Sequence, residues 1–564
     1  MRLVRKKIFF VLAGALSFAN PIFAQDLPVK TISFTGSLQS DMLFPQEDAS
    51  IGTGTYDQSF LSNTYLDLNL QSQYVSAGAR LELLNNPLPG FEDAFSGAGL
   101  PHVYVTARYK FAELTVGDFY DQFGSGFVFR AYEDRSLGID NSLRGARLVL
   151  NPYRGIHFKA LGGQQRVYFN FDDTNGYGFD YSKGCVWGAD LELGFEEWMP
   201  QLLEQNWHLT LGGSFVSRYQ PDEEIYVDPL TRLNLPLNVA TGDVRVRLQK
   251  GGYNLLLTYA YKANDPCADN NYIYKSGNAL MLSGSYSQRG MSFLLQAKRS
   301  DNMAFRSART QRGTAAFINN MPAFAMQHTY ALSSLYPYAT QVDGEWAFQA
   351  EARYVFKRYT KMGGKYGTSF KLNLSYITGL EKTFVDADNV MGTEGYSAPF
   401  FGFSSAPYYT DINLEFSKKL TKTFSFNATY MYQIYNQKVI EGKSHNGDLV
   451  KSHIGIVELK YQPSKKVGMR GELQYLYTQQ DLGQWMYASY ELSLLQSLML
   501  SVSDLYNVGE TNLHYPMVTA AYTWKAHRIQ VGYGKTRAGY NCAGGVCRYV
   551  PASRGVYVSY NVNF

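Results

Sequence analysis

The chain has 564 residues, 52 basic and 48 acidic, and the four-residue basic excess lies in the first 24 residues, so the remainder is balanced. Balanced charge gives no support to nucleic-acid binding or to steering of anionic substrates. Beyond residue 24 there is no run of about 20 apolar residues, which excludes a helical membrane protein.

The N-terminus is predicted to be a cleaved signal peptide, residues 1–24. Arg2, Arg5, Lys6 and Lys7 precede an uncharged stretch that ends at Ala24, the pattern of a secretory signal. We expect residues 25–564 to be the mature protein.

Alternating apolar and polar residues dominate the rest of the chain. Leu66–Gln71 alternates at every step, and the alternation resumes after Ser72-Gln73 from Val75 to Leu83. The same pattern returns at 370–376, 412–417 and 424–430. Roughly 24 such segments (22 to 26), each about ten residues long, match the strands of a transmembrane barrel. The predicted fold is all-β: a single large antiparallel transmembrane β-barrel.

Connection lengths assign the two sides of the membrane. Tight turns such as Arg289-Gly290 alternate with long polar segments such as Pro45–Gln58, as expected for short periplasmic turns and long external loops. Phe195–Asn206 falls where a tight turn is expected, and Trp198 with Leu202-Leu203 predicts a brief amphipathic helix there.

The C-terminus supports the same fold. Val556, Val558, Tyr560, Val562 and Phe564 share one face of a strand, and the chain stops on an aromatic residue. Tyr560, Val562 and Phe564 therefore resemble the signal read by the outer-membrane barrel assembly machinery.

All four cysteines are predicted to lie in external loops. The oxidising periplasmic route permits disulfides. Cys542 and Cys547 would close a small loop, which leaves Cys185 with Cys267 as the second pairing. No spacing typical of a zinc site is present, and no metal or other cofactor is predicted.

The polar positions of the strands place charges of both signs toward the lumen. Either they line a water-filled path, or acids and bases on neighbouring strands pair and fill a polar interior. The lumen-lining candidates are Arg80, Glu82, Arg108, Arg147, Lys159, Arg245, Arg247, Glu351, Arg353, Glu415, Arg470 and Glu472.

Two loops are candidates for narrowing the lumen. Phe119–Asn141 is rich in glycine and charge, which suits a constriction. Asp301–Ala339 (residues 301–339) is long and unusually apolar for a solvated loop, so it is either external or folded inward, and inward folding is favoured.

A family resemblance rests on this second loop. Met321-Pro322-Ala323, Gln327–Leu332, Leu335–Gln341 and Gly344-Glu345, with Val116–Phe119 and Arg144-Gly145, resemble an uncharacterised family of Bacteroidota outer-membrane proteins classed as a domain of unknown function. The resemblance implies an outer-membrane barrel and carries no catalytic residues.

Two functions follow as hypotheses. The first is a pore or channel for polar or amphiphilic solutes across the outer membrane. The second is a non-transporting barrel that serves as a scaffold or component of an outer-membrane secretion or assembly complex. Motifs of hydrolases and nucleotide-binding enzymes are missing from the sequence, so no enzyme is predicted. The expected partners are outer-membrane lipids and lipopolysaccharide, the assembly machinery and an outer-membrane protein.

Overall fold

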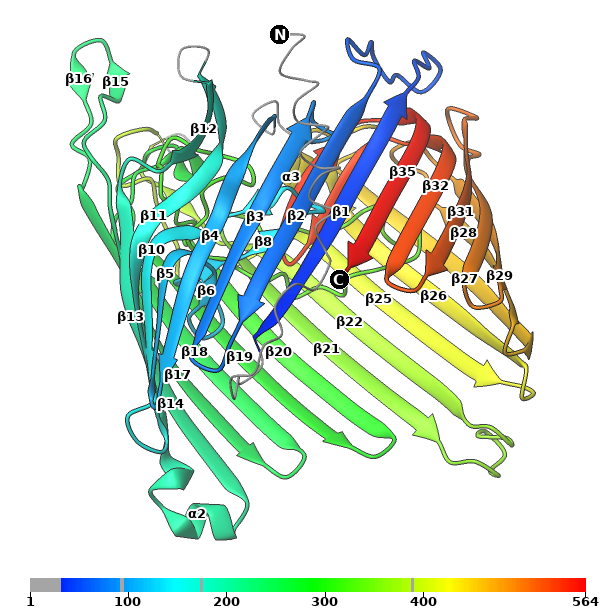
Figure 1. Ribbon diagram of the computed structural model, residues 1–564, viewed down its shortest axis with the longest axis horizontal. Helices are drawn as coiled ribbons and strands as arrows, with labels where there is room; N and C mark the ends of the chain where they lie inside the picture. The colour runs from blue at the N-terminus through cyan, green and yellow to red at the C-terminus, as the bar shows by residue number, and fades with distance from the viewer. Residues whose placement is uncertain (1–31, 92–95, 173–175, 387–389) are drawn as a thin grey trace, which may run out of the picture.

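The computed structural model describes residues 32–91, 96–172, 176–386 and 390–564. The predicted signal peptide lies outside the described residues. Twenty-four strands form a closed antiparallel barrel, as predicted (Figure 1). Each strand pairs with its neighbour along the chain, and β1 pairs with both β2 and β35, which closes the barrel.

The barrel strands are β1 (Ser33–Pro45), β2 (Leu61–Gln71), β3 (Val75–Asn85), β4 (Gly97–Tyr109), β5 (Ala112–Phe119), β10 (Leu143–Leu150), β11 (Ile156–Asp172), β13 (Cys185–Gly194), β14 (Trp207–Tyr219), β17 (Asn238–Lys250), β18 (Tyr253–Lys262), β19 (Gly277–Gln288), β20 (Met291–Asp301), β21 (Glu345–Phe356), β22 (Thr368–Leu380), β25 (Phe403–Lys419), β26 (Phe424–Asn436), β27 (Leu449–Ser464), β28 (Val467–Tyr477), β29 (Trp485–Leu494), β30 (Leu498–Asn507), β31 (His514–Trp524), β32 (His527–Thr536) and β35 (Ser553–Asn563).

Short elements occupy the connections. They are β6 (Asp121–Gln122), β7 (Arg130–Ala131), β8 (Glu133–Asp134), β9 (Ile139–Asp140), β12 (Gly176–Tyr181), η1 (Phe195–Glu197), α2 (Pro200–Glu204), β15 (Tyr226–Asp228), β16 (Thr231–Arg232), η2 (Ala268–Asn270), β23 (Thr383–Phe384), β24 (Tyr396–Ser397), α3 (Gln437–Glu441), β33 (Gly539–Ala543) and β34 (Val546–Val550). Helices η1 and α2 confirm the helical segment predicted between Phe195 and Asn206.

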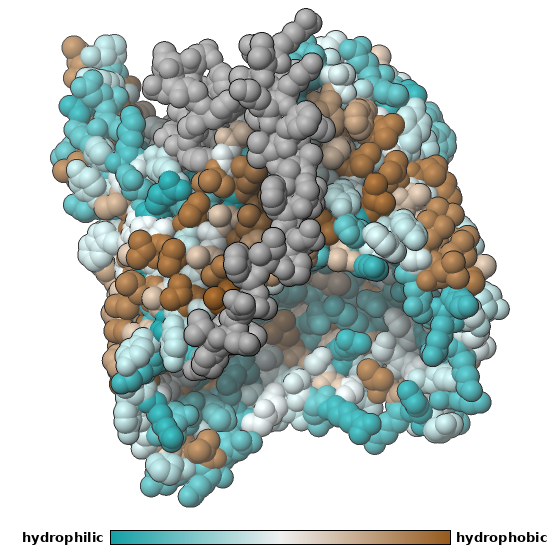
Figure 2. All heavy atoms as spheres, in the orientation of Figure 1, coloured by the Kyte–Doolittle hydropathy of each residue, from teal (hydrophilic) through white to brown (hydrophobic). Residues whose placement is uncertain are grey.

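The strands separate a lipid face from a lumen face. On β27, Lys451, His453, Gly455, Val457 and Leu459 are exposed, whereas the alternate residues from Val450 to Glu458 are buried. Hydrophobic residues gather across the middle of the outer surface visible in Figure 2. The exposed alternate set therefore faces lipid, and the buried set faces the lumen.

The short turns lie at the end of the barrel that carries α2, at the bottom of Figure 1, and the long loops lie at the opposite end. We name these the periplasmic and external ends, following the usual arrangement of such barrels.

Candidate functional site: a loop plug and a lumen chamber

The connection between β20 and β21, residues 302–344, folds into the lumen. We call it the plug. Phe305, Ile318, Leu332 and Ser333 are at most 1% exposed, which no loop standing in solvent would show. Its buried side chains join a core that also contains inward residues of the barrel strands, such as Ile454 and Met431. Most of the segment 301–339 thus lies inside the barrel.

A second loop, residues 120–142, meets the plug inside the lumen. Phe123, Phe127 and Phe129 are fully buried in the same core. The backbone NH of Arg130 donates to the Ile318 oxygen (2.7 Å), and Asn319 Nδ2 donates to the Phe127 oxygen (2.9 Å). The two inward loops therefore form one packed body.

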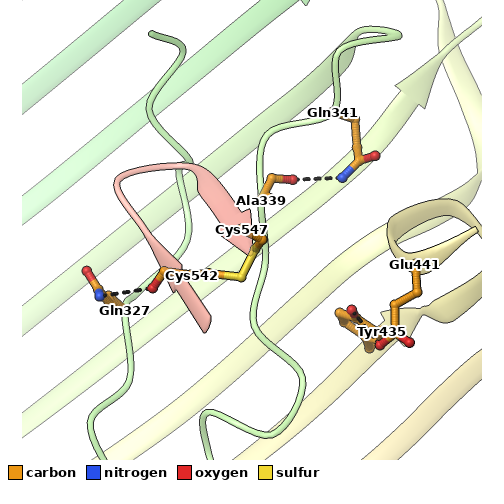
Figure 3. Close-up of a disulfide and its surroundings, with 7 residues drawn as sticks. All are labelled: Gln327, Ala339, Gln341, Tyr435, Glu441, Cys542 and Cys547. Atoms are coloured by element: carbon orange, nitrogen blue, oxygen red, sulfur yellow. Dashed lines mark hydrogen bonds between the residues drawn. A yellow bond between two sulfur atoms is a disulfide. The ribbon is translucent and has the colours of Figure 1, made fainter. Parts of the chain in front are cut away.

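A third contact comes from the connection between β32 and β35. Its hairpin, β33 and β34, is bridged by a disulfide between Cys542 and Cys547, as predicted (Figure 3). At the hairpin tip, the Gly545 oxygen accepts from the Thr340 backbone NH (3.0 Å), and Asn320 Nδ2 donates to the Gly544 oxygen (3.2 Å). Gln327 Nε2 donates to the Cys542 oxygen (3.2 Å). The hairpin thus forms hydrogen bonds with two separate parts of the plug.

The second predicted disulfide is wrong. Cys185 and Cys267 are free thiols. Cys185 begins β13, and Cys267 follows β18, so β14 and β17 lie between them in the sheet. Three strand spacings, each about 4.8 Å, separate the two strands, and their sum exceeds the roughly 4.4–6.8 Å between Cα atoms that a disulfide allows.

The depth of the plug can be followed along the wall. On β26 the inward residues Met431, Gln433 and Tyr435 are buried, whereas Ser425, Asn427 and Thr429 are half-buried. On this side of the barrel the plug therefore covers the external half of the wall and leaves the periplasmic half open to water.

A chamber of about 800 Å³ occupies this open half. Plug residues 326–330 form its ceiling, and the inward faces of β21, β22 and β25–β28 form its wall. Tyr330 of the plug accepts a hydrogen bond from Asn427 Nδ2 on β26 (2.8 Å). The lower centre of Figure 2 shows the hollow, surrounded by hydrophilic residues.

Most of the predicted lumen charges form ion pairs. Arg80 has four carboxylates within 4 Å: Asp67 and Glu82 on the wall, and Glu133 and Asp140 on the inward loop 120–142. Arg166 on β11 joins this cluster through Glu82 and Asp140. Arg80, Glu82 and Arg166 are buried, and the cluster ties the loop to the wall.

The other pairs lie along the wall, except that Asp121, which pairs with Arg147 and Lys159, belongs to the inward loop 120–142. Arg245 contacts Asp190, Glu192 and Asp243; Arg108 and Arg147 share Glu113; Arg147 and Lys159 share Asp121; Lys371 pairs with Glu351; and Arg470 contacts Glu458, Glu472 and Glu491. Among the described residues, Arg247, Arg353 and Glu415 have no ion pair within 4 Å. Arg353 and Glu415 instead line the chamber.

Sequence reasoning missed the partners that the inward loops contribute. Lys298 was not singled out, yet it is fully buried and pairs with Glu345 (2.8 Å). His328 of the plug contacts Asp411 on β25 (2.5 Å). Only the polarity of Lys298 at an inward position of β20 could have identified it.

Within the described part of the chain, no helix is long and apolar enough to cross a membrane. Nor do the described residues contain three or more His, Cys, Asp or Glu side chains grouped to hold a metal ion.

A closed barrel with an apolar outer face and a polar lumen satisfies every backbone group within lipid, and it is the architecture of outer-membrane proteins. The protein is an outer-membrane β-barrel whose lumen is filled from the external side by its own loops. The chain belongs to a family of unknown function (DUF6029), which it matches over residues 4–564.

No curated protein matches the chain. Similar solved structures include a mutant of the ferric enterobactin receptor PfeA from Pseudomonas aeruginosa, with 10% identity, a TM-score of 0.43 and coverage of 94% of this chain and 80% of that one. The siderophore receptor PirA from Acinetobacter baumannii has 9% identity, a TM-score of 0.43 and coverage of 95% and 81%. OccK8 (OprE) from Pseudomonas aeruginosa has 12% identity, a TM-score of 0.34 and coverage of 85% and 99%.

Proposed function

We propose that this protein is an outer-membrane channel for polar or amphiphilic solutes, narrowed from the external side by the plug, rather than an enzyme. The observation that carries the proposal is the change from buried to half-buried inward residues along β26, which marks the boundary between a filled external half and a water-filled chamber. A lumen filled only for stability would have no need of a polar chamber of this size.

The plug has the features of a movable closure. Both of its ends continue into barrel strands, so it can rearrange without leaving the barrel. Its contacts with the β33–β34 hairpin are hydrogen bonds at a loop tip rather than continuous strand pairing. Loop-tip contacts of this kind open at lower free energy than a sheet does.

Planar-bilayer recordings test the proposal. We would compare the intact protein with a variant in which residues 303–342 are replaced by a short Gly/Ser linker. The matched control shortens only the tip of the external β15–β16 hairpin, residues 227–231 (Figure 1), and keeps Gln220 and Pro236, which contact Arg309 of the plug. We expect larger conductance in the plug variant and no change in the control. Silence of the intact protein, shown to be folded by its heat-modifiable gel mobility, would overturn the proposal even if the plug variant conducts.

A scaffold role is the second candidate. The β15–β16 hairpin projects from the external end, and Leu230 near its tip is 94% exposed. An apolar tip of this kind suits docking to another outer-membrane protein. Recordings of the intact protein separate the two functions, because a channel conducts with its plug in place, whereas a scaffold barrel conducts only after its plug is replaced.

Biogenesis would use the C-terminal strand. Val562 pairs with Leu38 of β1, and Tyr560 pairs with Ser40, so the proposed assembly signal also closes the barrel. We propose that the assembly machinery reads Tyr560, Val562 and Phe564 before this pairing forms, and that lipopolysaccharide surrounds the external rim of the finished barrel.

A further inference from the structure

The wall of the lumen is not uniform. The fully buried residues of the internal core lie on the two inward loops and on strands from β5 to β29. Beyond β29, Leu505 on β30 and Tyr515 on β31 touch this core with partly buried side chains. The plug therefore packs against one side of the barrel, and the opposite side, β30, β31, β32 and β35, differs in chemistry.

The inward residues of those four strands form what we call the neutral strip. Ser501 pairs with Thr519, Thr519 with Gly532, and Gln530 with Ser559. These positions therefore lie on one face of the sheet. In these four strands, all described, Arg528 is the single charged inward residue. The inward set is Met499, Ser501, Ser503, Leu505, Asn507, Tyr515, Met517, Thr519, Ala521, Thr523, Arg528, Gln530, Gly532, Gly534, Thr536, Ser553, Gly555, Tyr557, Ser559, Asn561 and Asn563.

The neutral strip is partly open to solvent at mid-height, whereas Asn507 and Ser553 at its external end are buried. Thr519 and Ser559 are half-buried, whereas Gln433 and Ser452, which are inward on β26 and β27, are fully buried. Gly532 and Gly534 occupy successive inward positions on β32 and place no side chain in the lumen.

A cavity of about 520 Å³ lies against the strip toward the external end. Thr519, Gln530 and Ser559 supply hydroxyl and amide groups to its lining, and Leu43 and Met517 supply apolar surface. Asp41 of β1 and Arg548 of β34 add charged groups to the same lining. Above it stand Phe91 of the β3–β4 loop and Arg537, at the base of the segment that carries the disulfide hairpin. Arg537 Nη2 also donates to the Leu335 oxygen of the plug (3.3 Å). The external cover of the cavity is thus joined to the plug.

We propose that solutes cross the lumen off-centre, between the plug and the neutral strip, and that the solutes are uncharged polyols such as sugars. This inference rests on the proposed channel function. Serine, threonine, asparagine and glutamine both donate and accept hydrogen bonds, as sugar hydroxyls require. The leucine and methionine surface suits the apolar C–H faces of a sugar ring. The four strands themselves offer an ion a single charged inward residue, Arg528. The Asp41 carboxylate and the guanidinium groups of Arg537 and Arg548 at the cavity can also hydrogen-bond sugar hydroxyls.

The experiment uses the full chain in proteoliposomes, with swelling in isotonic sucrose as the readout. Thr519→Trp places a large side chain in the cavity. Ser283→Trp is the matched control, because Ser283 is a half-buried inward residue near the middle of β19, on the plug side. We expect sucrose-driven swelling to fall to the protein-free rate with Thr519→Trp and to persist with Ser283→Trp. Persistence of swelling with Thr519→Trp would overturn the proposed route.

A labelling experiment separates failure of the route from failure of the channel. In a background with Cys185 and Cys267 replaced by serine, Thr519→Cys and Ser452→Cys are treated with a membrane-impermeant maleimide in folded protein. Reaction of Thr519→Cys alone, slowed by sucrose, supports a solvent path along the strip even when the intact protein does not swell liposomes. Equal protection of both positions would contradict the path, whatever the conductance.

Discussion

Lys298 on β20 and Glu345 on β21 form an ion pair at 2.8 Å, with both side chains fully buried at the base of the plug. Lys298 Nζ also donates to the Pro322 oxygen (2.6 Å), and Glu345 accepts from the Gln341 backbone NH (2.9 Å). One buried pair thus orients chain segments near the middle and the end of the plug.

Removal of the cation alone should be strongly destabilising. Lys298→Met leaves the Glu345 carboxylate buried without its counter-ion, a change that costs about 3–5 kcal/mol in other buried pairs. We expect a lower temperature for the heat-modifiable mobility shift and faster protease cleavage within the plug. The double variant Lys298→Met/Glu345→Met should recover most of the loss, and equal damage in the single and double variants would contradict a pairing role.

Reduction of the Cys542–Cys547 disulfide should loosen the plug. Closing so short a loop restricts the unfolded hairpin by an amount worth ~2 kcal/mol in the chain-entropy treatment. With the bridge open, the contacts of Gly545 with Thr340 and of Cys542 with Gln327 lose their rigid support. We expect the Cys542→Ser/Cys547→Ser variant to show more frequent opening events in planar bilayers. The Cys185→Ser variant, which removes a free thiol, is the control.

Replacement of Arg80 should release the loop 120–142. Its guanidinium lies within 4 Å of four carboxylates, and Lys cannot reproduce that forked arrangement. Arg80→Met and Arg80→Lys should both increase proteolysis between residues 120 and 142, the former more. Arg353→Met, which removes an arginine without an ion pair among the described residues, should leave the digestion pattern unchanged.

A methyl group at Gly36 should disturb assembly. The Gly36 backbone NH donates to the Phe564 oxygen (2.7 Å), and a Cβ at this position would lie 2.5 Å from the Phe564 ring. Gly36→Ala must therefore displace the terminal aromatic residue. We expect a smaller fraction of heat-modifiable barrel in outer-membrane fractions. Gly455→Ala on β27, where nothing lies within 4 Å of the added carbon, should assemble normally.

The external loops contain a pH-dependent contact. His445 Nε2 lies 2.9 Å from Glu510 Oε2, and this hydrogen bond raises the pKa of His445 above its ordinary 6.5. Because the folded pKa is raised, the charged pair is present at low pH and is lost as pH rises through that value. Histidine titration by NMR in detergent micelles should show the raised pKa in the native chain. Glu510→Gln should return it toward 6.5, and an unchanged titration would exclude the contact.

The barrel itself was predictable because lipid imposes a two-residue period on every strand. Val75 to Leu83 shows it without reference to any other segment, and the tight turns defined the strand ends. The inward course of the plug had a weaker signal, the apolar composition of residues 321–326, which contradicts a solvated loop.

The ion clusters of the lumen could not be predicted. Arg80 and Glu82 carry the expected alternation, and the loop that contains Glu133 and Asp140 was a candidate for folding inward, but which of its acids would meet Arg80 depends on tertiary packing. The same holds for Lys298, whose role appears only when residues 322 and 340 are placed beside it. The neutral strip was equally hidden, because serine and threonine at alternate positions are ordinary on any lumen wall.

Attachment of the plug at both ends limits how the barrel can open. Residues 302–344 follow β20 and lead into β21, which are neighbouring paired strands of the barrel. The plug therefore cannot leave the lumen for the periplasm as a free domain. Any opening must therefore be a rotation or a local unfolding of the plug about its attachment to β20 and β21. Such a movement would leave the pairing of β20 with β21 in place, so the wall stays closed to lipid while the passage changes.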